Sequence, residues 1–378
     1  MQMVKFPGTD ITASRLGMGC MRLPVDSENK LNRPAAIKLI REAIDSGITY
    51  IDTAYVYHGK ESEDLVGEAL QDGYRERVTL VTKLPCWLVK EPADMEKLLD
   101  EQLAKLRTDY VDFYLLHSLD WEKYAEMREM GVHDFLNRMI EKGKIRYPAF
   151  SFHDDAEAFR KIITDYPWKM AQVQMNVLDE FNQATLENVY KYAEARGIGV
   201  VVMEPLRGGS LARNVPEDVL AIYDQAEVKR SPVEWAFRWL YDKTPFMTIL
   251  SGMSNEEQLR DNIRIFSEAQ TGVMTQQEKD MMTQVRLAYE SRIRVGCTGC
   301  EYCMPCPKGV KIPNIFRGVD SAAMFGTLEQ FKKRYAGMVE KGMGADQCVK
   351  CGLCEKQCPQ HISIREKLAQ IHKEFAEA

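Results

Sequence analysis

Four side chains with complementary acid–base chemistry follow one another in the first third of the sequence. They are a carboxylate, a phenol, an amine and an imidazole: Asp52, Tyr57, Lys83 and His117. A phenol has a pKa of about 10, so it is an effective acid only when its anion is stabilised. A nearby ammonium stabilises that anion, a carboxylate holds the ammonium in place, and an imidazole can orient a substrate oxygen. Such a set could protonate a carbonyl oxygen as hydride reaches the carbon, or run the reverse oxidation of an alcohol.

Successive apolar runs of the sequence end on polar groups of this kind. The runs are Tyr50–Asp52, Val78–Lys83, Tyr110–His117, Ile145–Ser151 and Met170–Asn176, the last of which carries Gln174. Each run predicts a strand, and the carboxyl ends of parallel strands are where α/β proteins build their sites. Taken singly, Asp52 could cap a helix and Lys83 could be a solvated loop residue. The recurrence at successive strand ends favours a shared site.

Strand and helix patterns alternate around these runs. A hairpin over residues 3–16 comes first, and further strands are predicted at Leu16–Gly19, Gly199–Met203 and Met247–Ser251. The predicted helices are Arg33–Asp45, Glu61–Leu70, Pro92–Leu106, Phe135–Lys142, Ala156–Thr164, Ala184–Arg196, Pro232–Tyr241 and Glu256–Ile265, with one more at Gln276–Arg294. Eight strands, each followed by a helix, predict an α/β fold of the (β/α)8 TIM barrel type. A doubly wound open sheet is the alternative, and the absence of a Gly-rich first turn argues against it.

The barrel resembles the aldo-keto reductase family over residues 3–270. The matching motifs are Leu16-Gly17-Met18-Gly19, Asp52-Thr53-Ala54 with Tyr57, Lys83, Tyr110-Val111-Asp112 with His117, and Gln258 with Asn262. The resemblance implies an NAD(P)-dependent oxidoreductase. It implies that Tyr57 is the acid, Lys83 the modulator of its pKa, Asp52 the partner of Lys83, and His117 the group that orients the carbonyl.

The resemblance also implies an NAD(P)H site built without a Rossmann fold. It places Ser151 and Gln174 at the carboxamide, Pro205, Leu206, Arg207 and Gly209 near the pyrophosphate, and Ser251, Gly252, Gln258 and Asn262 near the adenosine half. The chain departs from the family in two places. Phe152 follows Ser151 where the family usually has Asn, and the cations that many members use for a 2′-phosphate are replaced by Ser251-Gly252-Met253 and Gln258. The protein is therefore expected to use NADH at least as readily as NADPH. Arg207 is a cation that could replace the missing contacts to the 2′-phosphate.

Eight of the ten cysteines form two clustered runs near the end of the sequence. They are Cys297, Cys300, Cys303 and Cys306, followed by Cys348, Cys351, Cys354 and Cys358. Clustered thiols in a protein expected to be cytoplasmic indicate metal rather than disulfides. The second run has the Cys-x2-Cys-x2-Cys-x3-Cys-Pro spacing of bacterial ferredoxins, in which the fourth cysteine ligates the other cluster.

This region resembles a two-cluster 4Fe–4S ferredoxin module with a helical insert at Leu328–Val339. By the ferredoxin rule, one cluster takes the first three cysteines of the first run with Cys358, and the other takes the first three of the second run with Cys306. The first run has x2 where x3 is usual, so Cys306 departs from the ferredoxin spacing. Zinc is the alternative for four thiolates, although runs of four that end in proline favour clusters. Cys20 and Cys86 are interpreted as isolated core or loop thiols.

Length and composition fit this division. The 378 residues hold one barrel of about 250 residues plus a small unit, and we predict the boundaries 1–285 and 286–378. No apolar window suits a membrane span and the start lacks a signal peptide, so a cytoplasmic protein is predicted. From Cys297 onward, 12 Lys and Arg stand against 9 Asp and Glu, a small and interspersed excess that does not indicate nucleic-acid binding.

Two functions compete. The first is NAD(P)H-dependent reduction of a small-molecule carbonyl, or the reverse alcohol oxidation, with two 4Fe–4S clusters that exchange electrons with a redox partner protein. The second is a non-enzymatic electron carrier or redox-responsive binding protein on a barrel scaffold with structural clusters. A nicotinamide moves two electrons as hydride and a cluster moves one, and the sequence has no flavin motif to join them. The presence of all four acid–base residues favours the enzyme.

Overall fold

The computed structural model describes residues 1–180, 189–243 and 247–376. They divide into two compact units, the first of Met1–Gly209 with Val233–Gln276 and the second of Ser210–Pro232 with Gln277–Ala378. The predicted boundary after residue 285 falls inside helix α11 and stays a prediction. No helix in the described part of the chain has both the length and the hydropathy of a membrane span.

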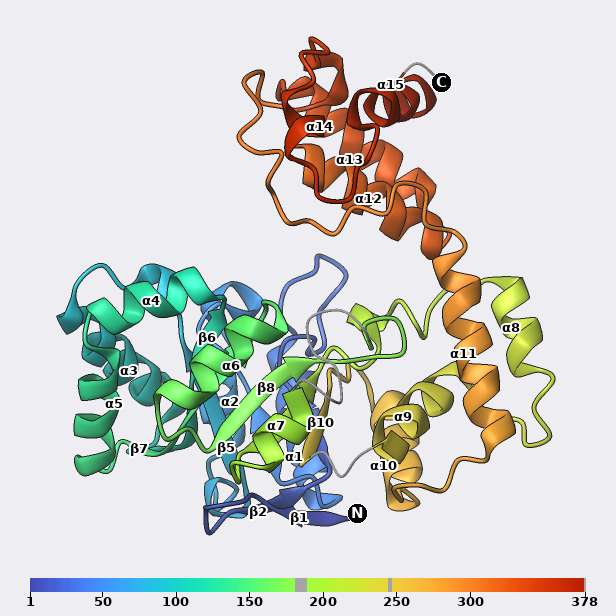
Figure 1. The fold of residues 1–378 in the computed structure, drawn as a ribbon. Coiled ribbons are helices and arrows are strands. Elements are labelled where there is room, and N and C mark those ends of the chain that lie inside the picture. The colour runs from blue at the N-terminus through green and yellow to red at the C-terminus, as the bar shows by residue number, and fades with distance from the viewer. Residues whose placement is uncertain (181–188, 244–246, 377–378) are drawn as a thin grey trace. The chain divides into compact units, whose positions relative to one another are not determined.

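Eight parallel strands close into a barrel in the first unit (Figure 1). They are β3 (Leu16–Gly19), β4 (Tyr50–Asp52), β5 (Thr79–Leu84), β6 (Val111–Leu119), β7 (Ile145–Phe152), β8 (Met170–Gln174), β9 (Gly199–Met203) and β10 (Thr248–Ser251). Neighbours pair in chain order and β10 pairs with β3, so the barrel has no open edge. The predicted barrel is confirmed, and the open sheet is excluded.

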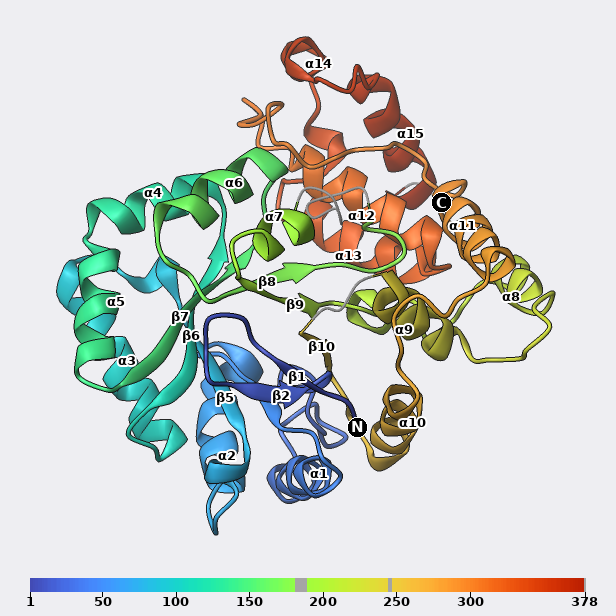
Figure 2. The ribbon, with the colours of Figure 1, turned by 60° about the horizontal axis from the view of Figure 1, so that its bottom comes forward.

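Helices surround these strands (Figure 2). They are α1 (Arg33–Asp45), α2 (Ser62–Ala69), α3 (Pro92–Leu106), α4 (Trp121–Glu129), α5 (Val132–Glu141), α6 (Ala156–Asp165), α7 (Lys191–Glu194), α9 (Pro232–Lys243) and α10 (Glu256–Ser267). Asn32 caps α1 by accepting a hydrogen bond from the N–H of Ala35. The predicted helix Ala184–Arg196 begins outside the described residues, and its described part contains α7. Sequence reasoning missed α4, which buries only Tyr124 and Met127 and so has little apolar periodicity.

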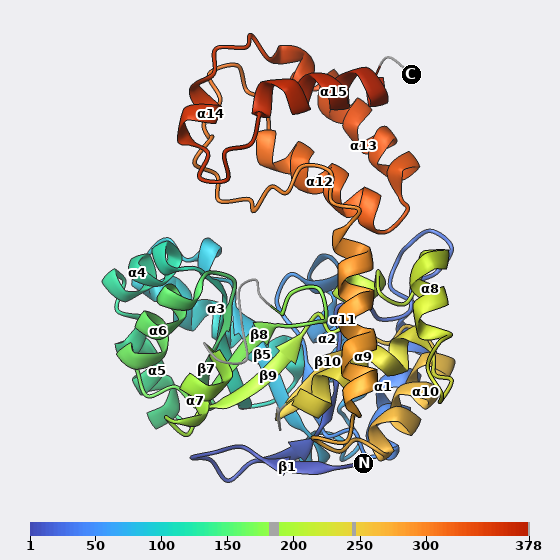
Figure 3. The ribbon, with the colours of Figure 1, turned by 45° about the vertical axis from the view of Figure 1, so that its right-hand side comes forward.

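An antiparallel hairpin of β1 (Met3–Lys5) and β2 (Thr12–Ser14) lies across one end of the barrel (Figure 3). Phe6, between these strands, is fully buried in the barrel interior, with its ring 5.1 Å from that of Phe113 and 6.0 Å from that of Tyr50. The interior is therefore a packed core that is closed at the amino ends of the strands. A functional site is therefore expected at the other end of the barrel, where the carboxyl ends of the strands lie.

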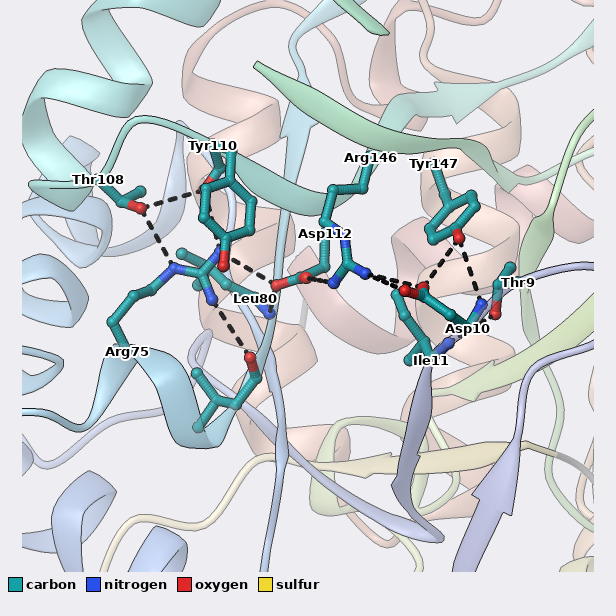
Figure 4. Close-up of polar contacts among 11 residues, drawn as sticks. Thr9, Asp10, Ile11, Arg75, Leu80, Thr108, Tyr110, Asp112, Arg146 and Tyr147 are labelled. Carbon is teal, nitrogen blue, oxygen red and sulfur yellow. Dashed lines mark hydrogen bonds and ion pairs between the residues drawn. The ribbon is translucent and has the colours of Figure 1, made fainter. Parts of the chain in front are cut away.

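A network of ions joins the hairpin to the strands at the closed end (Figure 4). Asp112 of β6 is 2% exposed, and its carboxylate accepts a hydrogen bond of 2.6 Å from Arg146 and lies 3.1 Å from Arg75. Arg146 also donates to Asp10 in the hairpin loop at 2.7 Å, and the hydroxyl of Tyr147 donates to Asp10 at 2.8 Å. Asp112, which the sequence marked only as part of a motif, is thus the buried centre of a structural network.

Asp112→Ala should destabilise the barrel by about 3–5 kcal/mol, because it leaves two partly buried guanidinium groups without their shared carboxylate. All five tryptophans belong to the first unit, so loss of tryptophan fluorescence in urea reports barrel unfolding. Asp45→Asn, in an exposed ion pair with Arg77, is the matched control and should leave the midpoint unchanged. A loss of less than about 1 kcal/mol in Asp112→Ala would mean that the network contributes little.

The second unit is helical in its described part. Its elements are α8 (Glu217–Tyr223), α11 (Gln276–Glu290), α12 (Ile312–Met324), α13 (Leu328–Glu340), α14 (Leu353–Gln357) and α15 (Ile364–Ala376). Helix α8 lies beside α11 (Figure 3), where Arg292 pairs with Asp218. Helices α12, α13 and α15 share an apolar core. The predicted insert helix is confirmed as α13, but α12, which begins with Pro313 in its first turn, was missed.

Candidate active site and cluster sites

The four predicted acid–base residues come together at the carboxyl ends of three neighbouring strands. Asp52 is the last residue of β4, Lys83 lies near the end of β5, and His117 lies in β6. Tyr57 follows β4 in the first connecting turn. Because β5 pairs with both β4 and β6, these side chains meet at one mouth of the barrel.

Lys83 is the centre of this group. Its Nζ donates to Asp52 Oδ1 at 2.7 Å and to the backbone carbonyl of Thr53 at 2.8 Å, and it lies 3.4 Å from the hydroxyl of Tyr57. Lys83 and Asp52 are 1% and 2% exposed. Burial alone would lower the pKa of Lys83, but the Asp52 carboxylate, with Tyr57, outweighs it and raises that pKa. Lys83 is therefore an ammonium that directs a positive charge at the Tyr57 oxygen.

A sharp turn presents Tyr57 to Lys83. The three residues after it, His58, Gly59 and Lys60, have φ values of 48°, 64° and 80°, all in the left-handed region. The turn is held from the side, since His58 Nε2 accepts a hydrogen bond of 3.1 Å from the N–H of Leu23. Burial raises the pKa of Tyr57, and the ammonium of Lys83 opposes this rise. The phenol is thus protonated in the resting protein and faces the group that would stabilise its anion.

An irregularity in β6 aims His117 at the same point. The β6–β7 register shifts between residues 116 and 119, and Ser118 has a φ of 59°. Such bulges redirect side chains next to active sites. The His117 ring stands edge-on to that of Tyr57 at 6.3 Å, and the half-exposed ring of Trp87 lies 5.1 Å away. Trp87 thus lines the site.

His117 is a neutral imidazole in this site. Burial, with further contributions from the charges of Lys83 and His153, lowers the pKa of His117 to about 2. A neutral imidazole carries one N–H donor and one acceptor. Its Nδ1 is buried and has no hydrogen-bond partner among the described residues. This combination suits a group that orients an uncharged substrate oxygen.

A second layer of buried polar side chains, missed by sequence reasoning, holds the backbone at Lys83. Gln102 of α3 donates to the Lys83 carbonyl at 2.9 Å and also hydrogen-bonds Glu63 of α2. Glu63 is fully buried and accepts a hydrogen bond of 2.6 Å from Thr82. Tyr114 donates to Gln102 at 2.7 Å. The sequence indicated this layer only through Glu63 and Gln102, which are polar residues on the buried faces of amphipathic helices.

The residues assigned to the carboxamide are placed by internal hydrogen bonds. Ser151, in β7, accepts one of 2.7 Å from the N–H of Ser118. Gln174, which ends β8, donates to Asp179 at 2.7 Å. The guanidinium of Arg207 lies 3.6 Å from the same aspartate. These residues come from β7, β8 and the loop after β9, on the side of the barrel opposite β4.

The residues assigned to the adenosine half gather at the start of α10. Asn262 donates to the hydroxyl of Ser251 at 2.9 Å, and the Gln258 side chain accepts a hydrogen bond of 2.8 Å from the N–H of Ser254. Gly252 lies between them in the loop after β10. Pro205, Leu206, Arg207 and Gly209 form the loop after β9, where Gly209 donates to the carbonyl of Leu206.

Glycines in these two loops make room for a cation that sequence reasoning missed. A Cβ on Gly252 would lie 3.2 Å from the side chain of Arg22, and a Cβ on Gly208 would lie 3.1 Å from the Arg22 guanidinium. Gly208 also has a φ of 67°. The Arg22 guanidinium donates a hydrogen bond of 3.2 Å to the Glu204 carboxylate. Glycine backbone beside the Arg22 guanidinium could accommodate the anionic diphosphate of a dinucleotide. In the sequence, the available indication was that Arg22 follows β3 by three residues and so lies at the carboxyl end of a strand.

Thiols from both cysteine runs line one cavity of about 130 Å³ in the second unit. Its lining includes Cys303 and Cys306 from the first run and Cys348, Cys351 and Cys354 from the second. Among the described residues, no three His, Cys, Asp or Glu side chains converge to suit one metal ion. Four thiolates can hold zinc or a 4Fe–4S cluster, and a cavity that thiols of both runs line is compatible with the larger group.

Three thiols, Cys297, Cys300 and Cys358, are not part of this cavity lining. Burial raises the pKa of Cys297, and the nearby thiols of Cys300 and Cys358 raise it further. Asp320 of α12 fixes the segment before Cys297, because its carboxylate accepts hydrogen bonds from the backbone N–H groups of residues 294–296 at 2.8–3.0 Å. Asp320 thus fixes the backbone that leads into the first cysteine run.

Comparisons with known proteins agree with both parts of the structure. Residues 15–276 match the aldo/keto reductase family model, and residues 296–363 match that of a 4Fe-4S dicluster domain. A probable aldo-keto reductase 1 of Glycine max is 28% identical over 227 residues, which are 58% of this chain, and the chain spans 63% of that relative's length.

Among solved structures, the fold is similar to that of the holo form of aldo-keto reductase AKR11C1 from Bacillus halodurans. The TM-score is 0.63 and the identity 24%, over 75% of this chain and 96% of that one. It is also similar to an aldo/keto reductase from Klebsiella pneumoniae in complex with NADP and acetate, with a TM-score of 0.58 and 21% identity over 75% and 96% of the two chains. These likenesses cover the barrel fold.

Proposed function

Because the chain belongs to the aldo-keto reductase family and carries a 4Fe-4S dicluster domain after its barrel, we propose that it reduces a small-molecule carbonyl with NAD(P)H, or oxidises the corresponding alcohol. The observation that carries this proposal is the position of Lys83. Its ammonium lies 2.7 Å from the Asp52 carboxylate and 3.4 Å from the Tyr57 hydroxyl. A scaffold that only carried electrons would not need this buried arrangement.

The side chains divide the work as follows. The neutral imidazole of His117 holds the carbonyl oxygen, and the phenol of Tyr57 donates its proton to that oxygen. Lys83 stabilises the phenolate that remains, and Asp52 keeps Lys83 charged within a buried site. When bound, the nicotinamide supplies hydride to the carbonyl carbon. In alcohol oxidation, the same groups would act in reverse.

We propose Ser151 and Gln174 as carboxamide contacts, the loop of Pro205, Leu206, Arg207 and Gly209 as the diphosphate site, and Ser251, Gly252, Gln258 and Asn262 as the adenosine site. The Klebsiella pneumoniae structure contains NADP. In this chain, however, the loop after β10 offers serine, glycine and glutamine in place of cations. Paired fluorescence titrations should therefore show NADH binding at least as tightly as NADPH. A clear NADPH preference would mean that another cation, such as Arg207, recognises the 2′-phosphate.

We propose that the second unit holds two 4Fe–4S clusters, one on Cys297, Cys300, Cys303 and Cys358 and one on Cys306, Cys348, Cys351 and Cys354. Cys306 lines one cavity with Cys348, Cys351 and Cys354, which supports the second ligand set, and Cys303 reaches the same cavity. The Cys-x3-Cys-Pro spacing at Cys358 supports the first set. Bound clusters would supply one-electron transfer, and a redox partner protein is the proposed recipient or donor.

Carbonyl-dependent oxidation of NAD(P)H tests the function. It should be measured anaerobically on protein with its clusters intact and on protein stripped of iron. If the barrel is the catalyst, oxidation requires the carbonyl and persists after iron removal for as long as the barrel stays folded. If the chain is an electron carrier only, no carbonyl in a panel of aldehydes and ketones will accelerate NAD(P)H oxidation in either preparation.

A further inference from the structure

Arg22 is a charged residue at the mouth of the barrel to which neither the family motifs nor the acid–base group gives a role. It lies three residues after β3, the strand that closes the barrel against β10. Its side chain is 36% exposed and its carboxylate partner, Glu204, is 30% exposed. An ion pair that is one-third exposed contributes little to stability, so this pair needs another explanation.

The side chain of Arg22 reaches from the loop after β10 to the loop after β9. Its aliphatic part passes Gly252, where a Cβ would lie 3.2–3.3 Å from Cβ, Cγ and Cδ. Its guanidinium ends beside Gly208 and bonds Glu204 at 3.2 Å. The backbone is held as well, since the hydroxyl of Ser254 donates to the Arg22 carbonyl at 2.8 Å. The side chain therefore lies along the two loops proposed for the dinucleotide.

The loop after β9 holds the carboxylate in an unusual backbone conformation. Glu204 and Arg207 both have left-handed φ values, of 54° and 46°, at positions that are not glycine. The Glu204 carbonyl is fixed by a hydrogen bond of 3.0 Å from Asn176. Left-handed non-glycine residues carry a conformational cost that is typical of ligand-binding loops. The loop thus places a carboxylate against a guanidinium where both can still meet solvent.

We propose that Arg22 binds the diphosphate of the dinucleotide, and that Glu204 occupies its guanidinium until the nucleotide arrives. A guanidinium donates paired hydrogen bonds to phosphate oxygens as well as to a carboxylate, so one anion can replace the other. The diphosphate is common to NADH and NADPH, so Arg22 contributes equally to both. This inference rests on the proposed function, because it presumes a dinucleotide at this mouth of the barrel.

Arg22→Gln tests the proposal in the full-length protein with clusters intact. The dissociation constants of NADH and NADPH, measured by fluorescence titration, should both rise by about tenfold, the size expected when a charge-assisted contact is lost. Arg22→Lys should restore part of the affinity. Glu204→Gln should shift the constants in the opposite direction, since it removes the competing anion. Arg77→Gln, in an exposed ion pair with Asp45, is the matched control and should change neither constant.

The outcomes separate the two proposals. If the wild-type protein binds neither dinucleotide, the proposed function and the role of Arg22 both fail. If it binds both and Arg22→Gln leaves the constants unchanged, the role of Arg22 alone fails. A loss confined to NADPH would also overturn it, because Arg22 would then bind a 2′-phosphate. A loss in Glu204→Gln equal to that in Arg22→Gln would show that the ion pair only supports the loops.

Discussion

Replacing Tyr57 with phenylalanine should lower carbonyl turnover by about 10²–10⁴-fold and leave the affinity for NAD(P)H nearly unchanged. The phenol is the acid that Lys83 Nζ faces at 3.4 Å, and phenylalanine keeps the ring while removing the proton. The neutral imidazole of His117, whose pKa is lowered to about 2, cannot replace it as an acid near neutral pH. Steady-state kinetics with a saturating aldehyde, together with a dinucleotide titration, measure both quantities.

Tyr55→Phe is the matched control for this substitution. Tyr55 lies two residues earlier in the same turn, but its hydroxyl donates to Glu101 on α3 and not to Lys83. Turnover should therefore stay close to that of the wild type. Near-normal turnover in Tyr57→Phe would remove Tyr57 from the role of acid, and an equal loss in both variants would point to a distorted turn.

The second large effect is expected in the cluster domain. Cys358→Ser and Cys306→Ser should each cost about half of the iron, because each thiol would ligate one of two four-iron clusters. The experiment measures iron and sulfide in protein purified without oxygen. Cys86→Ser, which changes a buried thiol of the barrel, is the control and should keep all of the iron.

Double substitutions show which thiols share a cluster. If ligation crosses between the runs, Cys297→Ser with Cys358→Ser should lose no more iron than either change alone. Cys348→Ser with Cys358→Ser should then lose both clusters. The reverse pattern would mean that each run is self-contained. Zinc at near-stoichiometric amounts, in protein never exposed to oxygen, would contradict the cluster assignment altogether.

The barrel could be predicted because its strands are short apolar runs bounded by polar ends, and the chain alternates them with amphipathic helices. The polar groups of the site were visible for the same reason. Asp52, Lys83 and His117 interrupt apolar runs at their carboxyl ends, where parallel strands collect functional groups. The family resemblance then implied the role of each residue. The contacts of Lys83 with Asp52 and Tyr57 are consistent with those roles.

Other features depend on contacts between distant segments that no local pattern encodes. Arg22 is an ordinary loop cation in the sequence, and only the folded loops bring Gly208 and Gly252 against it. Asp320 lies on a helix that was missed, yet its carboxylate fixes the backbone before Cys297. Helix α4 was missed because its two buried residues give almost no amphipathic signal.

The transfer of deuterium from NADH deuterated at C4 to an aldehyde tests the proposed chemistry most directly. The protein is incubated anaerobically with 4-nitrobenzaldehyde and other aldehydes, and the products are analysed by mass spectrometry and NMR. We predict one deuterated alcohol for each NADH oxidised, with the label on the carbinol carbon, and alcohol formation that is about 10²–10⁴-fold slower in Tyr57→Phe. Oxidation of NADH without a labelled alcohol, or labelled alcohol at the wild-type rate from Tyr57→Phe, would contradict hydride transfer assisted by Tyr57 and Lys83.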